Sequence, residues 1–253
     1  MISLLAVCGC APVESEPAKK TPTIPSTQTS AADDIPATTP TRAATPVPSD
    51  VIACDLALPA GEDWPVAVCE TFEENQNGWQ VESQENDYAR YTSYIEDGSY
   101  IVDYSAIVFG AYQNTAVTWF DITNAKDFSI TVEGLMDTLF EKTGWGIAFR
   151  GDEGSFFLFE IQNNATYSLS IYENTIWQPL IAPTPYSGIL IDQVNTIGVT
   201  ALDGDFDLFI NGEQVNRFEG GLLEGTQILL VVSAREGANT QYFFDNIVLQ
   251  TAP

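Results

Sequence analysis

From about Val51 to the C-terminus the chain is made of short runs rich in β-branched and aromatic residues, separated by Gly, Asn and Asp. Such runs predict strands, and no stretch shows a long helical period. The separators Glu96-Asp-Gly98, Asp203-Gly-Asp205 and Asn211-Gly212 suit tight hairpins. A segment of about two hundred residues of this kind predicts one antiparallel all-β domain over 51–253.

The candidate strands have this composition in common and are bounded by turn residues. They cover 79–83, 91–95, 100–104, 116–120, 128–132, 145–150, 156–161, 167–172, 196–202, 206–210, 228–234 and 242–249.

Three successive candidate strands show a period-two alternation that predicts their register. We expect Arg150 to face Phe156 and Ile161 to face Tyr167. One face is then the core, with Trp145, Ile147, Phe149, Phe157, Phe159, Ile161, Tyr167, Leu169 and Ile171. The reverse face carries Gly146, Ala148, Arg150, Phe156, Leu158, Glu160, Ser168, Ser170 and Tyr172. This mixture is typical of a concave sheet open to a polar ligand.

On the reverse face, five side chains are candidate ligand-binding residues: Arg150, Glu160, Ser168, Ser170 and Tyr172. Arginine and serine can hydrogen-bond sugar hydroxyls, and a tyrosine ring can stack on a sugar. Structural roles explain them equally well, because Arg150 could pair with Glu160 or with turn acids and Tyr172 could cover a sheet edge. Trp177 follows a turn of uncertain register, and we expect it to pack in the core.

Several short motifs occur in an order that resembles the concanavalin A-like lectin/glucanase jelly rolls, and especially bacterial laminin-G-like domains. The likeness spans about residues 69–250. It rests on Phe72, Gly78-Trp79, Asp97-Gly-Ser-Tyr100, Gly144-Trp-Gly-Ile-Ala-Phe-Arg150, Tyr167-Ser-Leu169, Trp177, Phe209-Ile-Asn-Gly212 and Phe244-Asp-Asn246. The resemblance implies a sandwich of two antiparallel sheets.

The resemblance also implies a structural calcium ion in some relatives, where it joins the first strand to the last. Glu73 or Glu74 and Asp245 occupy comparable places here, and calcium prefers oxygen ligands. The alternative for Asp245 is an ordinary hydrogen-bond acceptor. No other cofactor is expected.

The glucanases of this superfamily carry Glu-x-Asp-x-x-Glu on a strand, and this chain has no match. The nearest fragment, Glu133-Gly-Leu-Met-Asp137, has the wrong spacing. Glu160 is the only carboxylate on the three inferred strands, whereas glycosidases of the common kind need two. We therefore expect no catalytic residue.

The charge balance restricts the partners and the chemistry. The chain has 35 acidic and 9 basic residues, no histidine and a net charge of −26. Such a charge argues against nucleic acid as a partner, since phosphate binding draws on lysine and arginine. Without histidine, no Ser-His-Asp triad, Cys-His dyad or His-ligated metal site can form.

The N-terminal residues resemble the end of a bacterial lipoprotein signal peptide over 1–10. An apolar run ends at Gly9-Cys10, which makes Cys10 the expected lipidation site. The run lacks a basic region and is short, as it would be if translation began upstream. Residues 11–50 hold eight of the 14 prolines with many Thr, Ser and Ala, and they predict a disordered linker.

An exported protein meets oxidising conditions, so we expect Cys54 and Cys69 to form a disulfide. Closing a loop of about fifteen residues would stabilise the domain by roughly 3 kcal/mol. Two free thiols are the alternative if the protein is cytosolic.

Together these features predict a monomeric, lipid-anchored, extracytoplasmic surface protein with a non-catalytic domain that binds extracellular glycan. Two other hypotheses remain: a hydrolase or lyase acting on sugars, and a structural or adhesive surface domain. The first requires two converging carboxylates, and the second requires a flat patch without a groove.

Overall fold

The structure is a computed structural model that describes residues 64–75, 77–87, 89–107, 113–121, 126–138, 143–152, 154–221, 223–234 and 237–253. Over 113–121 it describes the backbone alone. All of these residues fall within one compact unit. The predictions for the signal peptide, the linker, Cys10 and Cys54 lie outside the described residues.

The described residues form strands and turns, and none of them lies in a helix that could cross a membrane. The strands are β1 (Val66–Glu70), β2 (Ser83–Glu85), β3 (Ala89–Glu96), β4 (Ser99–Ala106), β5 (Gln113–Asp121), β6 (Phe128–Asp137), β7 (Gly144–Gly151), β8 (Ser155–Gln162), β9 (Thr166–Glu173), β10 (Ile176–Pro185), β11 (Asn195–Leu202), β12 (Asp205–Ile210), β13 (Glu213–Phe218), β14 (Gln227–Ala234) and β15 (Asn239–Thr251).

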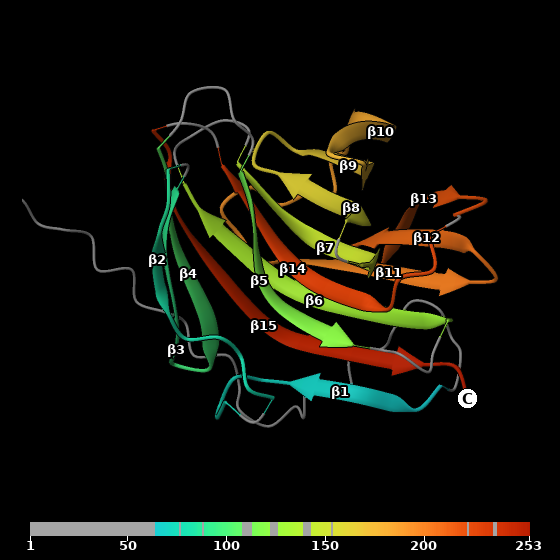
Figure 1. Ribbon diagram of the computed structural model, residues 1–253, viewed down its shortest axis with the longest axis horizontal. Coiled ribbons are helices and arrows are strands. Elements are labelled where there is room, and N and C mark those ends of the chain that lie inside the picture. The colour runs from blue at the N-terminus through green and yellow to red at the C-terminus, as the bar shows by residue number, and fades with distance from the viewer. Residues whose placement is uncertain are drawn as a thin grey trace, which may run out of the picture. The chain divides into compact units, whose positions relative to one another are not determined.

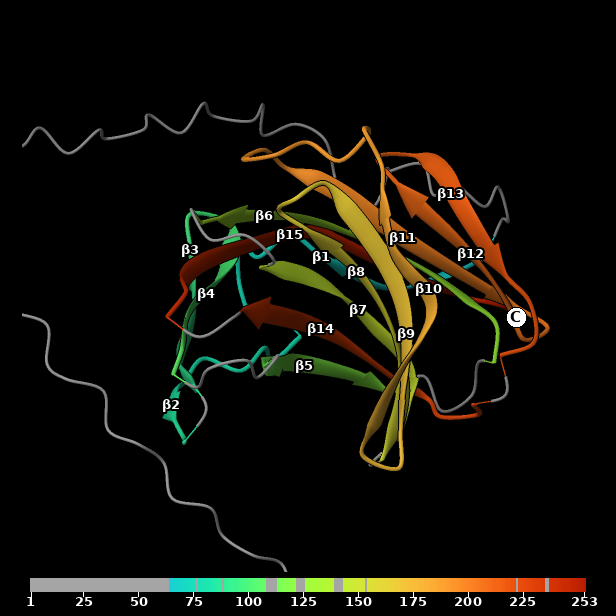
Figure 2. The same ribbon diagram turned by 90° about the horizontal axis from the view of Figure 1, so that it is seen from above.

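The strands form two antiparallel sheets (Figure 1). The nine-stranded sheet has the order β13-β12-β11-β6-β15-β4-β3-β2, with β1 also paired to β15. The six-stranded sheet has the order β10-β9-β8-β7-β14-β5. This second sheet is strongly twisted. In Figure 2 the strands β9 and β10 at one edge run at a steep angle to β5 and β14 at the other edge. The predicted all-β sandwich is confirmed.

The three predicted hairpin turns are present, and each has two successive residues with positive φ. Asp97 and Gly98 have φ values of 51° and 71°, between β3 and β4. Asp203-Gly204 and Asn211-Gly212 have the same conformation. Asp, Asn and Gly tolerate this backbone better than other residues do, which is why such pairs mark type I′ hairpins.

The predicted register of β7, β8 and β9 is the observed one. Phe149 faces Phe157, and Ile161 faces both Trp145 and Tyr167. The nine residues assigned to the core face all join the main core, where Ile171 is partly buried and the other eight are buried. Full burial of such a side chain contributes roughly 1.5–3 kcal/mol to folding, so this alternation strongly favours one register.

The strand β15 is bent by a bulge between Asp245 and Val248. Its first half pairs with β4 through residues 239–244, and its second half pairs with β1 through residues 247–250. β4 and β1 therefore share one edge of β15, on either side of the bulge (Figure 1).

The predicted strand over 79–83 is wrong. Trp79 precedes β2 in an irregular segment and is buried against Phe72 and Tyr100, with ring centroids at 4.8 and 5.1 Å. The buried carboxylate of Glu70 accepts hydrogen bonds from the Trp79 indole N–H and from the Phe72 backbone N–H. Side-chain hydrogen bonds hold Trp79 in place, and backbone pairing with β3 begins only at Glu82, which exchanges two hydrogen bonds with Ser93.

Four strands were not predicted: β1, β10, β13 and β2, which shares only Ser83 with the predicted strand over 79–83. β10 contains Pro179, Pro183 and Pro185, and it lies at the edge of its sheet, where proline is tolerated because no partner strand needs its N–H. β13 is largely polar and is also an edge strand. Neither sequence shows a clear apolar alternation.

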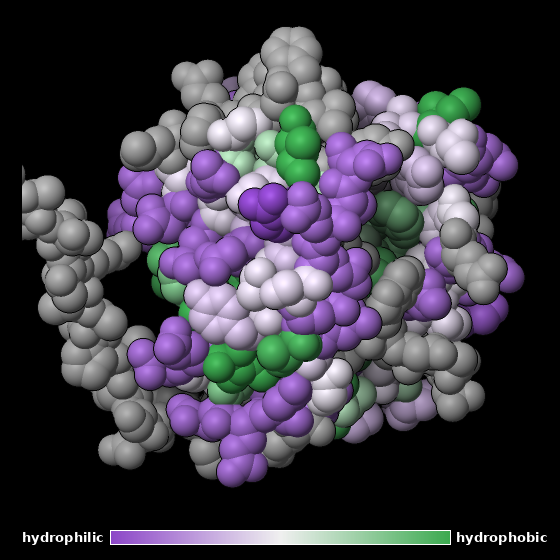
Figure 3. Space-filling view, turned by 60° about the vertical axis from the view of Figure 1, so that its left-hand side comes forward, coloured by the Kyte–Doolittle hydropathy of each residue, from purple (hydrophilic) through white to green (hydrophobic). Residues whose placement is uncertain are grey.

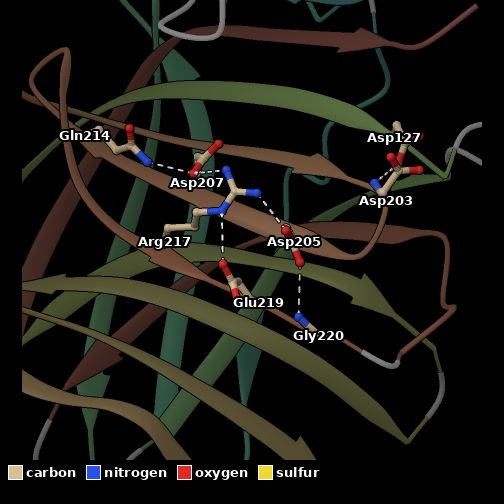
Figure 4. A network of polar contacts seen from close by, with 8 residues as sticks. All are labelled: Asp127, Asp203, Asp205, Asp207, Gln214, Arg217, Glu219 and Gly220. Carbon is tan, nitrogen blue, oxygen red and sulfur yellow. Dashed lines mark hydrogen bonds and ion pairs between the residues drawn. The ribbon is translucent and has the colours of Figure 1, made fainter.

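Several acidic side chains are grouped around Arg217 on β13. Its guanidinium lies 2.7 Å from a carboxylate oxygen of Asp205 and 3.5 Å from one of Asp207 (Figure 4). Hydrogen bonding to Asp205 raises the pKa of Arg217. Figure 3 shows that hydrophilic residues also dominate the side of the domain that carries β2, β3 and β4.

Candidate functional site

The face of the six-stranded sheet that points away from the core is the candidate site, and we call it the outer face. Register pairs place Glu160 beside Gly146 and Ser168, and Tyr172 beside Phe156. Trp177 on β10 faces Tyr172 and joins the same side. Leu229, Val231 and Ser233 extend the outer face onto β14, since each pairs with an outer-face residue of β7.

An aromatic cluster occupies one end of the outer face and consists of Phe156, Tyr172 and Trp177. Ring centroids lie 5.3 Å apart for Phe156 and Tyr172, and 5.0 Å apart for Tyr172 and Trp177. Phe156 and Tyr172 are half-buried, whereas Trp177 is 39% exposed. Aromatic rings presented to solvent in this way can stack on the apolar face of a sugar.

The expectation that Trp177 packs in the core is wrong. Asn174 and Thr175 form the turn before β10, with φ values of 52° and 65°. This two-residue turn sets the register in which Trp177 lies opposite Tyr172 on the outer face. This turn could not be predicted from its residue types, because a β-branched residue such as Thr175 rarely has positive φ.

The middle of the outer face is closed to solvent. Ala148, Leu158, Leu229 and Val231 form a second apolar cluster, and each of them is at most 4% exposed. This region therefore differs from the open concave surface that the sequence predicted. A ligand could reach the aromatic cluster on one side of it.

The polar end of the outer face contains Glu160, whose side chain is 3% exposed. Its carboxylate accepts hydrogen bonds from Gln162 Nε2 at 2.8 Å and from Ser233 Oγ at 3.2 Å. The facing strand has Gly144, and a Cβ there would lie 2.7 Å from Oε1 of Glu160. Glycine at this position thus gives room for a buried, hydrogen-bonded carboxylate.

Arg150 does not lie on the outer face, so its predicted position is wrong. It has a φ of 49°, at a point where the pairing of β7 with β14 shifts. Its guanidinium lies 5.5 Å from the ring centroid of the core residue Phe206, and Nη2 donates to the carbonyl oxygen of Lys126 at 2.9 Å. Asp127 is 3.9 Å away. The bulge turns Arg150 inward, where burial lowers the pKa of its guanidinium.

Ser168 and Ser170 lie on β9 between the polar and aromatic ends, opposite Glu160 and Leu158. Both are partly exposed. Of the five predicted ligand-binding residues, the sheet therefore brings Ser168, Ser170 and Tyr172 to accessible positions on one strand. Phe156 and Trp177 were missing from that set. The predicted register already put Phe156 on this face, whereas the location of Trp177 depends on the observed turn before β10.

The predicted calcium ligands are only partly brought together, at the bulge of β15. Burial raises the pKa of Asp245 to about 6, and the negative charges of Glu133, Glu73 and Glu70 add to this shift. Glu74 is exposed and is not among those charges.

The acidic side chains at the bulge do not form a complete calcium site. No three Asp, Glu, Cys or His side chains of the described residues lie close enough together to hold a metal ion. Calcium would therefore need several backbone carbonyl oxygens, which it commonly accepts as ligands.

Cys69 lies in β1 opposite Val248 and takes part in a disulfide. The other three cysteines, Cys8, Cys10 and Cys54, lie outside the described residues. The pairing of Cys69 with Cys54 therefore stays a prediction.

Comparison with solved structures finds the same two-sheet jelly-roll fold in laminarinase catalytic domains. The catalytic domain of an endo-1,3-β-glucanase (laminarinase) from Thermotoga petrophila is 11% identical, with a TM-score of 0.52 over 76% of this chain and 100% of that chain. The laminarinase catalytic domain from Thermotoga maritima is also 11% identical, with a TM-score of 0.52 over 76% of this chain and 99% of that one.

The carbohydrate binding module CBM66 from Bacillus subtilis is 12% identical, with a TM-score of 0.42 over 69% of this chain and 96% of that chain. No protein-family model matches the sequence, and no curated protein matches it. The likeness to the laminarinase domains shows the fold and, at this identity, nothing finer.

Proposed function

We propose that this protein is a lipid-anchored surface protein whose jelly roll binds extracellular glycan and performs no reaction on it. The observation that carries the proposal is the aromatic cluster on the outer face, where Trp177 is 39% exposed beside Tyr172. Large aromatic side chains are usually buried, either in a core or in a binding interface. A group of three at the edge of a sheet is well suited to stacking on sugars.

The carboxylates of the outer face favour binding over hydrolysis. Among β7, β8, β9 and β10, Glu160 is the only acidic residue whose register position lies on this face, and its side chain is buried and hydrogen-bonded to Gln162 and Ser233. Glycosidases of the common type need a second carboxylate about 5–10 Å away, with room for the sugar between the two. We therefore assign Glu160 a positioning role within the sheet.

The anchor and the location are proposed from the sequence. Lipidation of Cys10 would attach the chain to the cell membrane, and the Pro-rich residues 11–50 would hold the domain away from it. We propose that the domain acts as a monomer, without nucleic acid as a partner, and that any calcium bound near Asp245 has a structural role.

A glycan array probed with the purified, fluorescently labelled protein tests the proposal. We expect binding to one class of glycan, with strong loss of signal for Trp177→Ala. The same protein should release no reducing sugar from the bound glycan during prolonged incubation. Release that is abolished by Glu160→Gln would support a hydrolase instead, and absence of binding to any glycan would favour a structural or adhesive domain.

A further inference from the structure

The three rings of the aromatic cluster form a compact triangle. The centroid distances are 5.0 Å for Tyr172 and Trp177, 5.3 Å for Phe156 and Tyr172, and 5.5 Å for Phe156 and Trp177. Because the three distances are nearly equal, the rings do not form a row along which successive sugars of a long chain could stack. The cluster is comparable in size to a single sugar ring.

The ring orientations lead to the same conclusion. The planes of Phe156 and Tyr172 are inclined by 31°, those of Tyr172 and Trp177 by 50°, and those of Phe156 and Trp177 by 80°. Three rings inclined in this way cannot offer one flat platform to an ordered polysaccharide surface. Trp177, the most exposed of them, is the ring best placed to stack on a ligand.

The surroundings limit the ligand on two sides. Towards the middle of the sheet, Leu158 and Leu229 are 4% and 2% exposed, so a sugar chain cannot continue across β7 and β14 in contact with them. On the other side, β10 is the edge strand of the sheet. Between these limits, the partly exposed hydroxyls of Ser168 and Ser170 are the nearest polar groups of β9 on this face.

The charges nearby select against acidic sugars. Arg150 is the only basic residue in β7, β8, β9 and β10, and its guanidinium is directed at the core ring of Phe206. Glu173, next to Tyr172, is exposed, and the whole chain has a net charge of −26. A sulfate or uronate group would therefore meet repulsion here.

We propose that the aromatic cluster recognises one neutral sugar residue at the end or branch of a glycan, stacked on Trp177, rather than an extended segment of a chain. This inference rests on the proposed glycan-binding function and adds the size and charge of the ligand. It makes Trp177 the main contact, supported from behind by Tyr172 and Phe156.

Calorimetric titration with oligosaccharide ladders tests the inference. The probes are β-1,3-glucan, β-1,4-glucan, β-1,4-galactan and β-2,6-fructan oligomers, each from the disaccharide to the hexasaccharide, with a sulfated galactan as the charged counterpart. For the ladder that binds, we expect the affinity of the disaccharide to be within about threefold of that of the hexasaccharide. The sulfated probe should not bind.

Three variants test whether Trp177 is the main contact. Trp177→Ala should lower the affinity at least about tenfold, whereas Ile176→Ala, which changes an exposed neighbour on the same strand, should leave it unchanged. Trp177→Phe keeps a ring for folding, and it should abolish the ligand-induced change in tryptophan fluorescence while retaining weak binding.

Different results would contradict the single-sugar inference and the proposed glycan-binding function. Affinity that rises more than about tenfold from disaccharide to hexasaccharide, or full affinity in Trp177→Ala, would overturn the inference and leave glycan binding intact. Lack of binding to every ladder and to the glycan array would contradict the proposed function and the inference together.

Discussion

The ring of Tyr172 lies 5.0 Å from the ring of Trp177, its cross-strand neighbour on β10. The same tyrosine ring lies 5.3 Å from that of Phe156 on β8. Tyr172 therefore sits between two other rings, and it has both a packing role and a position on the proposed ligand-binding surface.

We expect Tyr172→Ala to weaken glycan binding and to lower stability by about 1–3 kcal/mol, because it removes two aromatic contacts worth about 0.5–1.5 kcal/mol each. Tyr172→Phe keeps both contacts and should leave the melting temperature unchanged. Binding by the two variants is measured by calorimetry. Unaltered binding in a destabilised Tyr172→Ala protein would make Tyr172 a packing residue only.

Arg150→Ala should act on stability and not on binding. The change removes the contact with the Phe206 ring and leaves the carbonyl oxygen of Lys126 without this donor. Loss of such buried polar contacts costs about 1–3 kcal/mol. Denaturant unfolding measures the loss, and Arg217→Ala on the exposed surface is the matched control. A fall in glycan affinity without a change in stability would instead indicate that Arg150 contacts the ligand.

The stability of the domain should depend on the protonation of Asp245. The folded-state pKa of this carboxyl is about 6, above the value of roughly 3.9 for an unfolded chain. Between pH ~4 and ~6 the folded state retains a proton that the unfolded state has lost, so the stability from this group falls as the pH rises through that window.

In calcium-free buffer, Asp245→Asn should therefore flatten the pH dependence of unfolding. Because Asp245 is partly exposed, we expect this substitution to raise the free energy of unfolding at pH ~7 by only about 1 kcal/mol. If calcium binds here, adding it at neutral pH should raise the melting temperature of the wild-type protein and leave that of Asp245→Asn unchanged. An equal response of both proteins would argue against this calcium site.

Cys10→Ala should release the protein from the membrane fraction of its native host, because the thiol that accepts the lipid is removed. Cell fractionation followed by immunoblotting measures the release. Cys8→Ala is the control and should stay with the membrane. An intact, unlipidated Met1 terminus in mass spectra of the wild-type protein would exclude the anchor.

Non-reducing peptide mapping should recover one linked pair, Cys54 with Cys69. Reduction should then lower stability by roughly 3 kcal/mol for a loop of about fifteen residues. Quantitative alkylation of both thiols before reduction, in protein prepared from the cell envelope, would refute the pairing.

The register of β7, β8 and β9 could be predicted because its alternation is unbroken. A slip of one residue would move Phe149, Phe157 and Leu169 to the outer face and turn Glu160, Ser168 and Ser170 towards the core. The inward turn of Arg150 could not be predicted in the same way. It depends on a bulge where β7 pairs with β14, a strand that lies about 80 residues further along the chain.

The aromatic cluster was also only partly predictable. Tyr172 follows from alternation, but Trp177 depends on a turn at Asn174-Thr175 that the residue types do not favour. The three prolines of β10 also argue against a strand when the sequence is considered alone. The most exposed ring of the site, that of Trp177, therefore lies on a strand whose pairing is interrupted by two register shifts.

The pairing of β1 with β15 has a mechanical consequence. Tension that reaches the domain from residues before Val66 is applied to β1, which is bonded to the last strand through Val66–Gln250 and the following pairs to Glu70–Ile247. A pull along the strand axis shears the backbone hydrogen bonds between β1 and β15. All of these bonds then resist the separation of the two strands together. The force at which this short ladder ruptures therefore sets the load that β1 can bear before it separates from the sheet.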